Sequence, residues 1–98
     1  MRRPFAVVRS RGSAWDDSKP LEGQLDWPAH AAFMDAMAAG GFILLGGPLE
    51  ETRDVLLIFQ AQGCPEIHDR LAADPWTRNG LLITKNCRPW RIPLGSLP

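Results

Sequence analysis

Apolar residues cluster into four short stretches that are typical of β-strands. These stretches are rich in β-branched and aromatic side chains, and turn-forming residues bound them. The predicted strands cover residues 5–10, 42–48, 54–60 and 81–84, and the last of them can extend through Trp90. The short polar segment 49–53 is expected to join the second and third strands as a hairpin.

Two further stretches carry apolar side chains at the spacing of one helix face. The first begins at Asp26-Trp27-Pro28, with the proline in its first turn and either Asp26 or Trp27 as the cap, and it ends at Gly40-Gly41. The second begins at Cys64-Pro65 and is expected to end near Asp74, because the proline that follows does not continue a helix cleanly.

The resulting order, βαββαβ, predicts an α+β, ferredoxin-like antiparallel sheet with both helices on one face. Right-handed crossovers then place the strands in the order 4-1-3-2. Residues 42–45 and 55–59 are apolar without alternation, as in strands whose two faces are both buried. Two short helices cover only one face, so we expect the helix-free face to bury itself against a second copy, forming a homodimer.

Length and charge narrow the class of protein. The 98 residues form a single domain, 1–98, and Lys plus Arg and Asp plus Glu both number 11. Without a positive excess, neither nucleic acid nor a membrane is an expected partner. Cys64 and Cys87 lack the spacing of a zinc site and are interpreted as reduced thiols. The run of apolar residues near the N-terminus is too short for the core of a signal peptide, which predicts a cytoplasmic protein.

His30 and Asp74 are the residues most suggestive of chemistry. In the predicted topology the first helix starts, and the second helix ends, at the end of the sheet where the first strand finishes. His30 lies on the apolar stripe of the first helix, and Asp74 lies on that of the second. A carboxylate on a buried face at a helix C-terminus needs compensation, for which His30 or an arginine is the expected partner.

The same end of the sheet collects several candidate substrate-binding residues. The long, turn-rich segment 11–26 is a candidate lid over this site, because connections of this length in compact domains tend to be functional. Together these groups outline a pocket for a small molecule. The candidates are Arg9, Arg11, Gly47, Pro48 and Trp76.

Four motifs together resemble the YCII (YciI-like) domain family, over roughly the whole chain and in matching order. They are Trp27-Pro28-Ala29-His30, the run from Gly40 to Pro48, Asp74-Pro75-Trp76 and Arg88-Pro89-Trp90. The resemblance implies a ferredoxin-like fold, dimerisation as an α/β barrel, and an active site that contains His30 and Asp74. The chain differs from the family pattern in its long first loop and its short polar hairpin.

The sequence therefore predicts an enzyme in which His30 is the general acid/base and Asp74 orients and charges it. Proton transfer of a lyase or isomerase type, on a small polar or aromatic substrate, is the expected reaction, with Arg9 or Arg11 binding an anionic group. No metal or organic cofactor is expected, because one histidine and one aspartate fall short of a catalytic zinc site. A non-catalytic binding module with the same pocket, or a purely structural dimerisation domain, remains an alternative. His68 is expected to face water.

Overall fold

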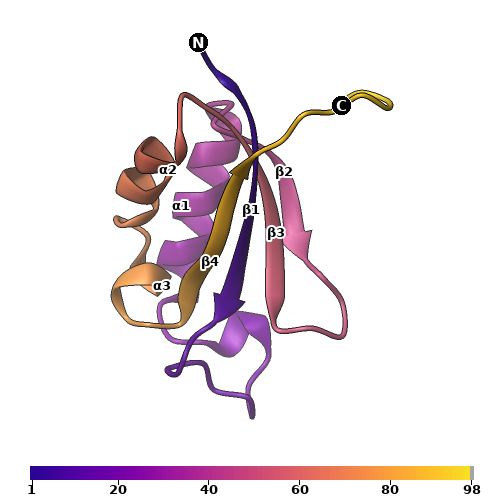
Figure 1. The fold of residues 1–98 in the computed structure, drawn as a ribbon. Coiled ribbons are helices and arrows are strands. Elements are labelled where there is room, and N and C mark those ends of the chain that lie inside the picture. The colour runs from indigo at the N-terminus through magenta and orange to yellow at the C-terminus, as the bar shows by residue number, and fades with distance from the viewer. Residues whose placement is uncertain (98) are drawn as a thin grey trace.

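The computed structural model describes residues 1–97 and forms one sheet with helices on one side (Figure 1). The order of elements is β-α-β-β-α-α-β, with a 3-10 helix in the first connection. The elements are β1 (Arg3–Arg11), η1 (Leu21–Gly23), α1 (Trp27–Ala39), β2 (Ile43–Pro48), β3 (Asp54–Ala61), α2 (Cys64–Leu71), α3 (Pro75–Arg78) and β4 (Leu82–Pro89).

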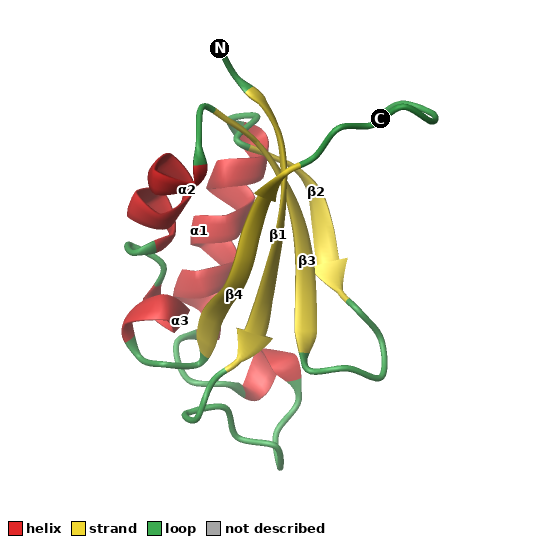
Figure 2. Ribbon diagram, viewed as in Figure 1, coloured by secondary structure: helices red, strands yellow, loops and turns green. Residues whose placement is uncertain are grey.

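The four strands are antiparallel and lie in the order β2-β3-β1-β4, which confirms the predicted topology (Figure 2). In the central pair, Phe5 lies opposite Phe59 and Val7 lies opposite Leu57. These residues point toward the helices and pack with Met37 of α1. Ile67 and Leu71 of α2 complete this core, so burial of one face of the sheet fixes both long helices.

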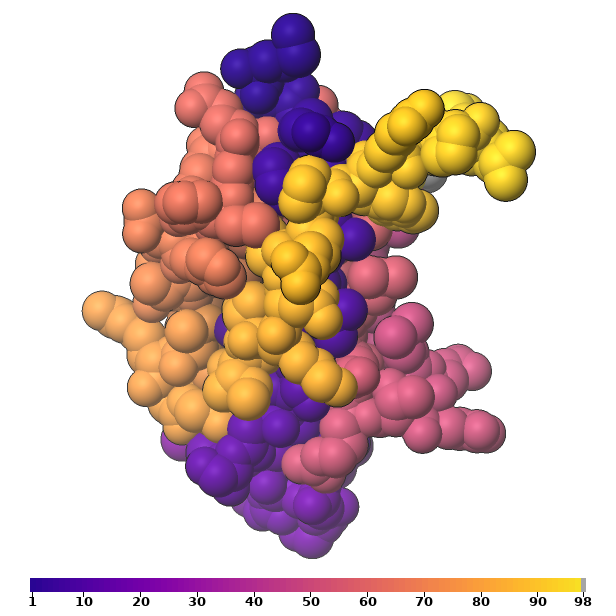
Figure 3. Space-filling view, viewed as in Figure 1, coloured from indigo at the N-terminus to yellow at the C-terminus, as the bar shows by residue number. Residues whose placement is uncertain are grey.

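The connection after β1 lies at one end of the molecule, and the two chain termini lie at the other (Figure 1). After β4 the chain leaves the body as an extended segment, coloured yellow in the space-filling view (Figure 3). The described C-terminal residues therefore leave free the end of the sheet that carries the predicted site. None of the helices described within residues 1–97 is long and apolar enough to cross a membrane.

Asp74 does not end the second helix, and that part of the sequence prediction was wrong. Helix α2 ends at Leu71, and Asp74 is the N-cap of the separate short helix α3, with its side chain accepting a hydrogen bond from the Trp76 backbone N–H. Pro75 occupies the first turn of α3, where a missing N–H costs nothing. Asp74 therefore lies at the positive end of a helix and not at the negative end.

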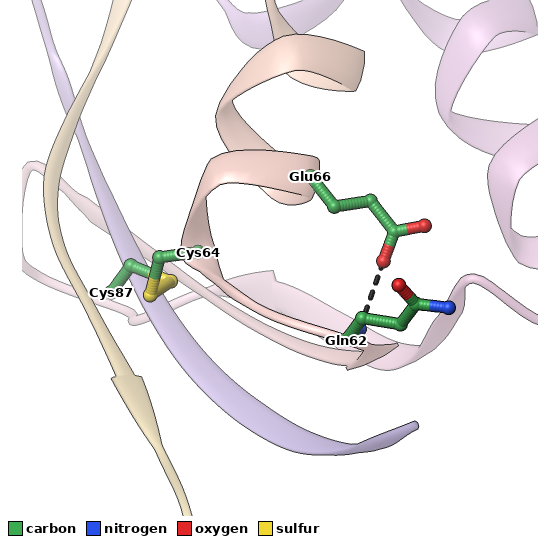
Figure 4. Close-up of a disulfide and its surroundings, with 4 residues drawn as sticks. All are labelled: Gln62, Cys64, Glu66 and Cys87. Atoms are coloured by element: carbon green, nitrogen blue, oxygen red, sulfur yellow. Dashed lines mark hydrogen bonds between the residues drawn. A yellow bond between two sulfur atoms is a disulfide. The ribbon is translucent and has the colours of Figure 1, made fainter. Parts of the chain in front are cut away.

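Cys64 and Cys87 form a disulfide between the start of α2 and strand β4, so the interpretation as reduced thiols was wrong (Figure 4). Only the tertiary fold brings these residues together, with Cα atoms 6.1 Å apart. Disulfides persist mainly in oxidising compartments. The cytoplasmic location stays a prediction, and the disulfide weighs against it.

Candidate functional site

A cavity of about 200 Å³ lies between the sheet and the connection that follows β1. Its walls come from the ends of β1 and β2, the start of β3, the first turns of α1, and α3. Most of the lining is apolar or aromatic, and the ionisable residues among it are Arg9, Arg11, His30 and Asp54. The predicted site end is therefore hollow and is not filled by side chains.

His30 is held in place from two sides. Its Nδ1 lies 2.8 Å from Asp74 Oδ1, and its ring stacks on Trp76 with centroids 3.8 Å apart and planes inclined by 6°. The other ring nitrogen, Nε2, makes no hydrogen bond to residues 1–97. It is also not one of the fully buried polar atoms that lack a partner. Nε2 is therefore the ring nitrogen that is not fully buried, and His30 is one of the residues that line the cavity.

Asp74 is completely buried, and both of its oxygens are hydrogen-bonded. Oδ1 is hydrogen-bonded to His30 Nδ1 and to the Trp76 backbone N–H, while Oδ2 accepts a hydrogen bond from Arg9 Nη1 at 2.9 Å. Burial acts to raise the pKa of Asp74, but the hydrogen bonds from His30, Trp76 and Arg9 outweigh it and hold that pKa below its ordinary value. An ionised carboxylate only accepts hydrogen bonds, so His30 Nδ1 must carry the proton.

Arg9 holds the second carboxylate oxygen of Asp74, and its side chain also lines the cavity. It is 0% exposed, and its guanidinium donates to Asp74, to Thr77 Oγ1 and to the backbone oxygen of Leu82. Burial lowers the pKa of Arg9 from its ordinary value, and the ion pair with Asp74 opposes that effect. Arg9, Asp74 and His30 thus form one buried chain that ends at the cavity.

Arg11 differs from Arg9 although both lie on the same face of β1. Its side chain is half-buried, and its guanidinium lies over the Trp15 ring, 4.4 Å from the ring centroid. Within residues 1–97 the Arg11 side chain has neither a carboxylate partner nor a hydrogen bond. Arg11 is therefore the cation of the cavity wall that is available to an anionic ligand.

The end of β2 supplies the backbone wall. Gly47 and Pro48 line the cavity together with Gly46. A Cβ at Gly46 would lie 2.7 Å from the Leu56 backbone oxygen and 2.5 Å from a Leu57 methyl carbon. Only glycine allows β2 to approach β3 this closely at the site.

The connection after β1 is pinned by Gln24, a residue that the sequence analysis did not identify. The Gln24 side chain is buried, accepts from the Asp16 N–H, and donates to the backbone oxygens of Asp16, Lys19 and Pro20. Trp76 Nε1 donates to the Leu25 oxygen and ties the same segment to α3. These hydrogen bonds hold the connection after β1 in place. No sequence motif predicts this role of Gln24.

The predicted residues meet at one place. His30, Arg9, Arg11, Gly47, Pro48 and Trp76 all line the cavity, and Asp74 lies directly behind His30. His68 is exposed on α2, away from the cavity. Residues 1–97 contain no group of three His, Cys, Asp or Glu side chains that could hold a metal ion.

The fold is similar to that of a solved structure from another protein. That structure is 5-chloro-2-hydroxyhydroquinone dehydrochlorinase from Burkholderia phenoliruptrix in complex with 2,5-dihydroxybenzoquinone, with a TM-score of 0.61, 22% sequence identity, and coverage of 89% of this chain and 93% of that chain. No family model and no curated protein matches the chain. The similarity establishes the ferredoxin-like fold, and membership of the YCII family stays a prediction.

Proposed function

We propose that this protein is a cofactor-independent enzyme of the YCII type, in which His30 moves a proton to or from a small polar or aromatic substrate. The observation that carries the proposal is the contact between His30 Nδ1 and Asp74 Oδ1, which leaves Nε2 free on a residue that lines a largely apolar cavity. A histidine oriented by a buried carboxylate, with its second nitrogen free, is a common general acid/base arrangement.

Asp74 serves this reaction in two ways. As an acceptor for Nδ1–H it selects the tautomer whose lone pair is on Nε2, which is the form that can remove a proton. Once Nε2 has taken up that proton, the carboxylate at 2.8 Å stabilises the resulting imidazolium. Stacking on Trp76 restricts rotation of the ring, so the geometry is set before a substrate arrives.

The reaction class follows from what a single acid/base group can do. When Nε2 removes a proton from a carbon or oxygen, the electron pair stays on the substrate, where it either expels a leaving group or is protonated at another atom. The first course is an elimination and the second an isomerisation. The fold neighbour is named a dehydrochlorinase, which is a lyase-type activity on a ring compound, and this supports the same class here.

A non-catalytic binding module is the second candidate. The buried Arg9–Asp74–His30 chain would then hold a recognition group in place for a ligand that leaves unchanged. A structural dimerisation domain is the weakest of the three alternatives, because the site end contains an open cavity.

The partner of the helix-free sheet face is proposed to be a second copy of the chain. Ile83, which pairs with Ser10 on the face away from the helices, is 54% exposed, and Leu45 of the edge strand β2 is 39% exposed. Half-buried Val8 and Leu56 lie between them in the sheet. Apolar groups gathered on one face favour association.

A substrate screen with paired histidine variants tests the proposed function. Ring compounds with an acidic C–H or O–H next to a leaving group are incubated with the wild type, His30→Gln and His68→Gln. Loss of the acid/base group is expected to lower turnover about 100-fold or more in His30→Gln, while exposed His68 provides a control that leaves it unchanged. Turnover that survives His30→Gln contradicts the proposal, and saturable binding without turnover favours the binding module.

A further inference from the structure

We infer that the cavity takes a single-ring aromatic monoanion, with the anionic oxygens against Arg11 and the edge of the ring that reacts near His30 Nε2. This inference deepens the proposed function and rests on it for the role of His30. The size of the cavity, its aromatic walls and its unequal charges carry the inference independently of one another.

Size limits the ligand to one ring. An apolar cavity of about 150 Å³ accommodates benzene, so a cavity of about 200 Å³ has room for a six-membered ring with a few small substituents. Pockets that hold drug-sized ligands have volumes of about 300 Å³ or more. A nucleotide, a fused polycyclic compound or a peptide would therefore leave most of its surface outside.

The walls favour a flat ligand. Trp15 meets Trp76 edge to face at a centroid distance of 5.4 Å, and Trp27 meets Trp76 at 5.7 Å. Three indoles and the His30 imidazole thus form one side of the cavity. Aromatic pairs with these offset or edge-on geometries gain stabilisation beyond their buried area, which a planar ring obtains and a puckered ring does not.

The charges favour an anion. Arg11 has no carboxylate partner in the described chain, whereas the carboxylate of Asp54, the acidic group that lines the same cavity, is 3.4 Å from Lys85 Nζ. The Arg9 charge is already compensated by Asp74. One uncompensated guanidinium beside apolar walls matches one anionic group, such as a carboxylate or phenolate, which it binds through charge-assisted hydrogen bonds.

The test is a calorimetric titration with matched probes. Benzoate and 4-nitrophenolate are the anionic aromatic probes, benzamide is the neutral aromatic probe, and cyclohexanecarboxylate is the anionic but puckered probe. We expect saturable binding of both aromatic anions and much weaker binding of the other two. Equal binding of benzamide or cyclohexanecarboxylate, or no binding of benzoate at millimolar concentration, would overturn the ligand class.

Arginine variants place the anion in the cavity. Arg11→Met keeps most of the apolar stem and should weaken benzoate binding about tenfold or more, the effect of losing one charge-assisted hydrogen bond. Arg11→Lys should retain part of the affinity, and Arg78→Met, which alters an exposed arginine of α3, should retain all of it. Unchanged benzoate affinity in Arg11→Met would refute the inference.

The outcomes separate this inference from the proposed function. Benzoate binding that depends on Arg11, together with no turnover that depends on His30, supports the ligand class and refutes the enzyme. Turnover that depends on His30, on a substrate that is neutral or not aromatic, supports the enzyme and refutes the ligand class.

Discussion

The buried ion pair of Arg9 and Asp74 offers the sharpest test of how the site is built. Both side chains are 0% exposed, and the shortest N–O distance between them is 2.9 Å. Arg9→Met would leave the carboxylate buried with its bonds from His30 and Trp76, and Asp74→Asn would leave the guanidinium buried without its counter-charge. Removing one partner of a buried pair costs about 3 to 5 kcal/mol of unfolding free energy, and we expect a cost of this size for each variant.

The double variant should cost clearly less than the sum of the single ones, because neither charge is then left unpaired. Residues in direct contact show coupling energies of about 0.5 to 3 kcal/mol, and we expect the upper half of that range here. The chain offers a matched control, since exposed Arg53 and Asp17 also lie 2.9 Å apart. For that pair, Arg53→Met and Asp17→Asn should each cost no more than about 1 kcal/mol.

Urea denaturation followed by tryptophan fluorescence measures all of these free energies, because Trp15, Trp27 and Trp76 are clustered at the site. If the buried cycle proved additive, or if the buried and exposed pairs had the same effect, burial would not determine the energetics of this pair. The account of the site as a rigid, charge-compensated chain would then be wrong.

Acid should weaken this site in a defined direction. The pKa of Asp74 is lower in the folded protein than in the unfolded chain, so the folded state binds fewer protons between those two values. The stabilisation of the fold by ionised Asp74 is fully present above the pKa of this residue in the unfolded chain, about 4. It is lost as the pH falls through the pKa of Asp74 in the folded protein. Asp74→Asn should therefore lose less stability on acidification than the wild type, and equal losses would contradict this assignment.

Three further predictions concern the rest of the fold. The disulfide of Cys64 and Cys87 closes a loop with a sequence separation of 23 and should contribute about 3 to 4 kcal/mol to the free energy of unfolding. The loss of stability in the variant with both cysteines replaced by serine measures this contribution, and thiol alkylation of the unreduced protein would disprove the bond. A homodimer should appear in sedimentation equilibrium, with Ile83→Asp monomeric, and a wild-type monomer at micromolar concentration would rule it out. Gln24→Ala should expose residues 12–25 to proteolysis, because four hydrogen bonds to the backbone are lost; an unchanged digestion pattern would refute its pinning role.

The topology and the meeting of His30 with Asp74 could be predicted from the sequence, because proline and glycine mark the helix ends and the connectivity fixes which ends coincide. Arg9 is different, since it follows Phe5 and Val7 at a spacing of two residues and therefore lies on the same buried face of the strand. That pattern was available, but alternation alone does not say which carboxylate neutralises the guanidinium. The sequence analysis therefore left both Arg9 and Arg11 as candidate anion-binding residues.

Other features depend on tertiary structure or on a local pattern with two meanings. Asp74-Pro75 was interpreted as a helix stop, yet an aspartate before proline is equally the start of a new helix, and only packing decides between them. The pairing of Cys64 with Cys87 follows from the approach of α2 to β4 and has no local signal. The same holds for Gln24, whose partners are backbone atoms of a loop without regular pattern.

The most direct test of the central claim is the tautomer of the His30 ring, measured by ¹⁵N NMR of imidazole-labelled protein at alkaline pH, where imidazoles are neutral. The account predicts a proton on Nδ1, held by Asp74, and an unprotonated Nε2 whose resonance shifts when benzoate enters the cavity. His68, which is exposed, should show the tautomer mixture of free histidine and no shift. A proton on His30 Nε2 in the wild type would contradict the claim that this atom faces the substrate as a base.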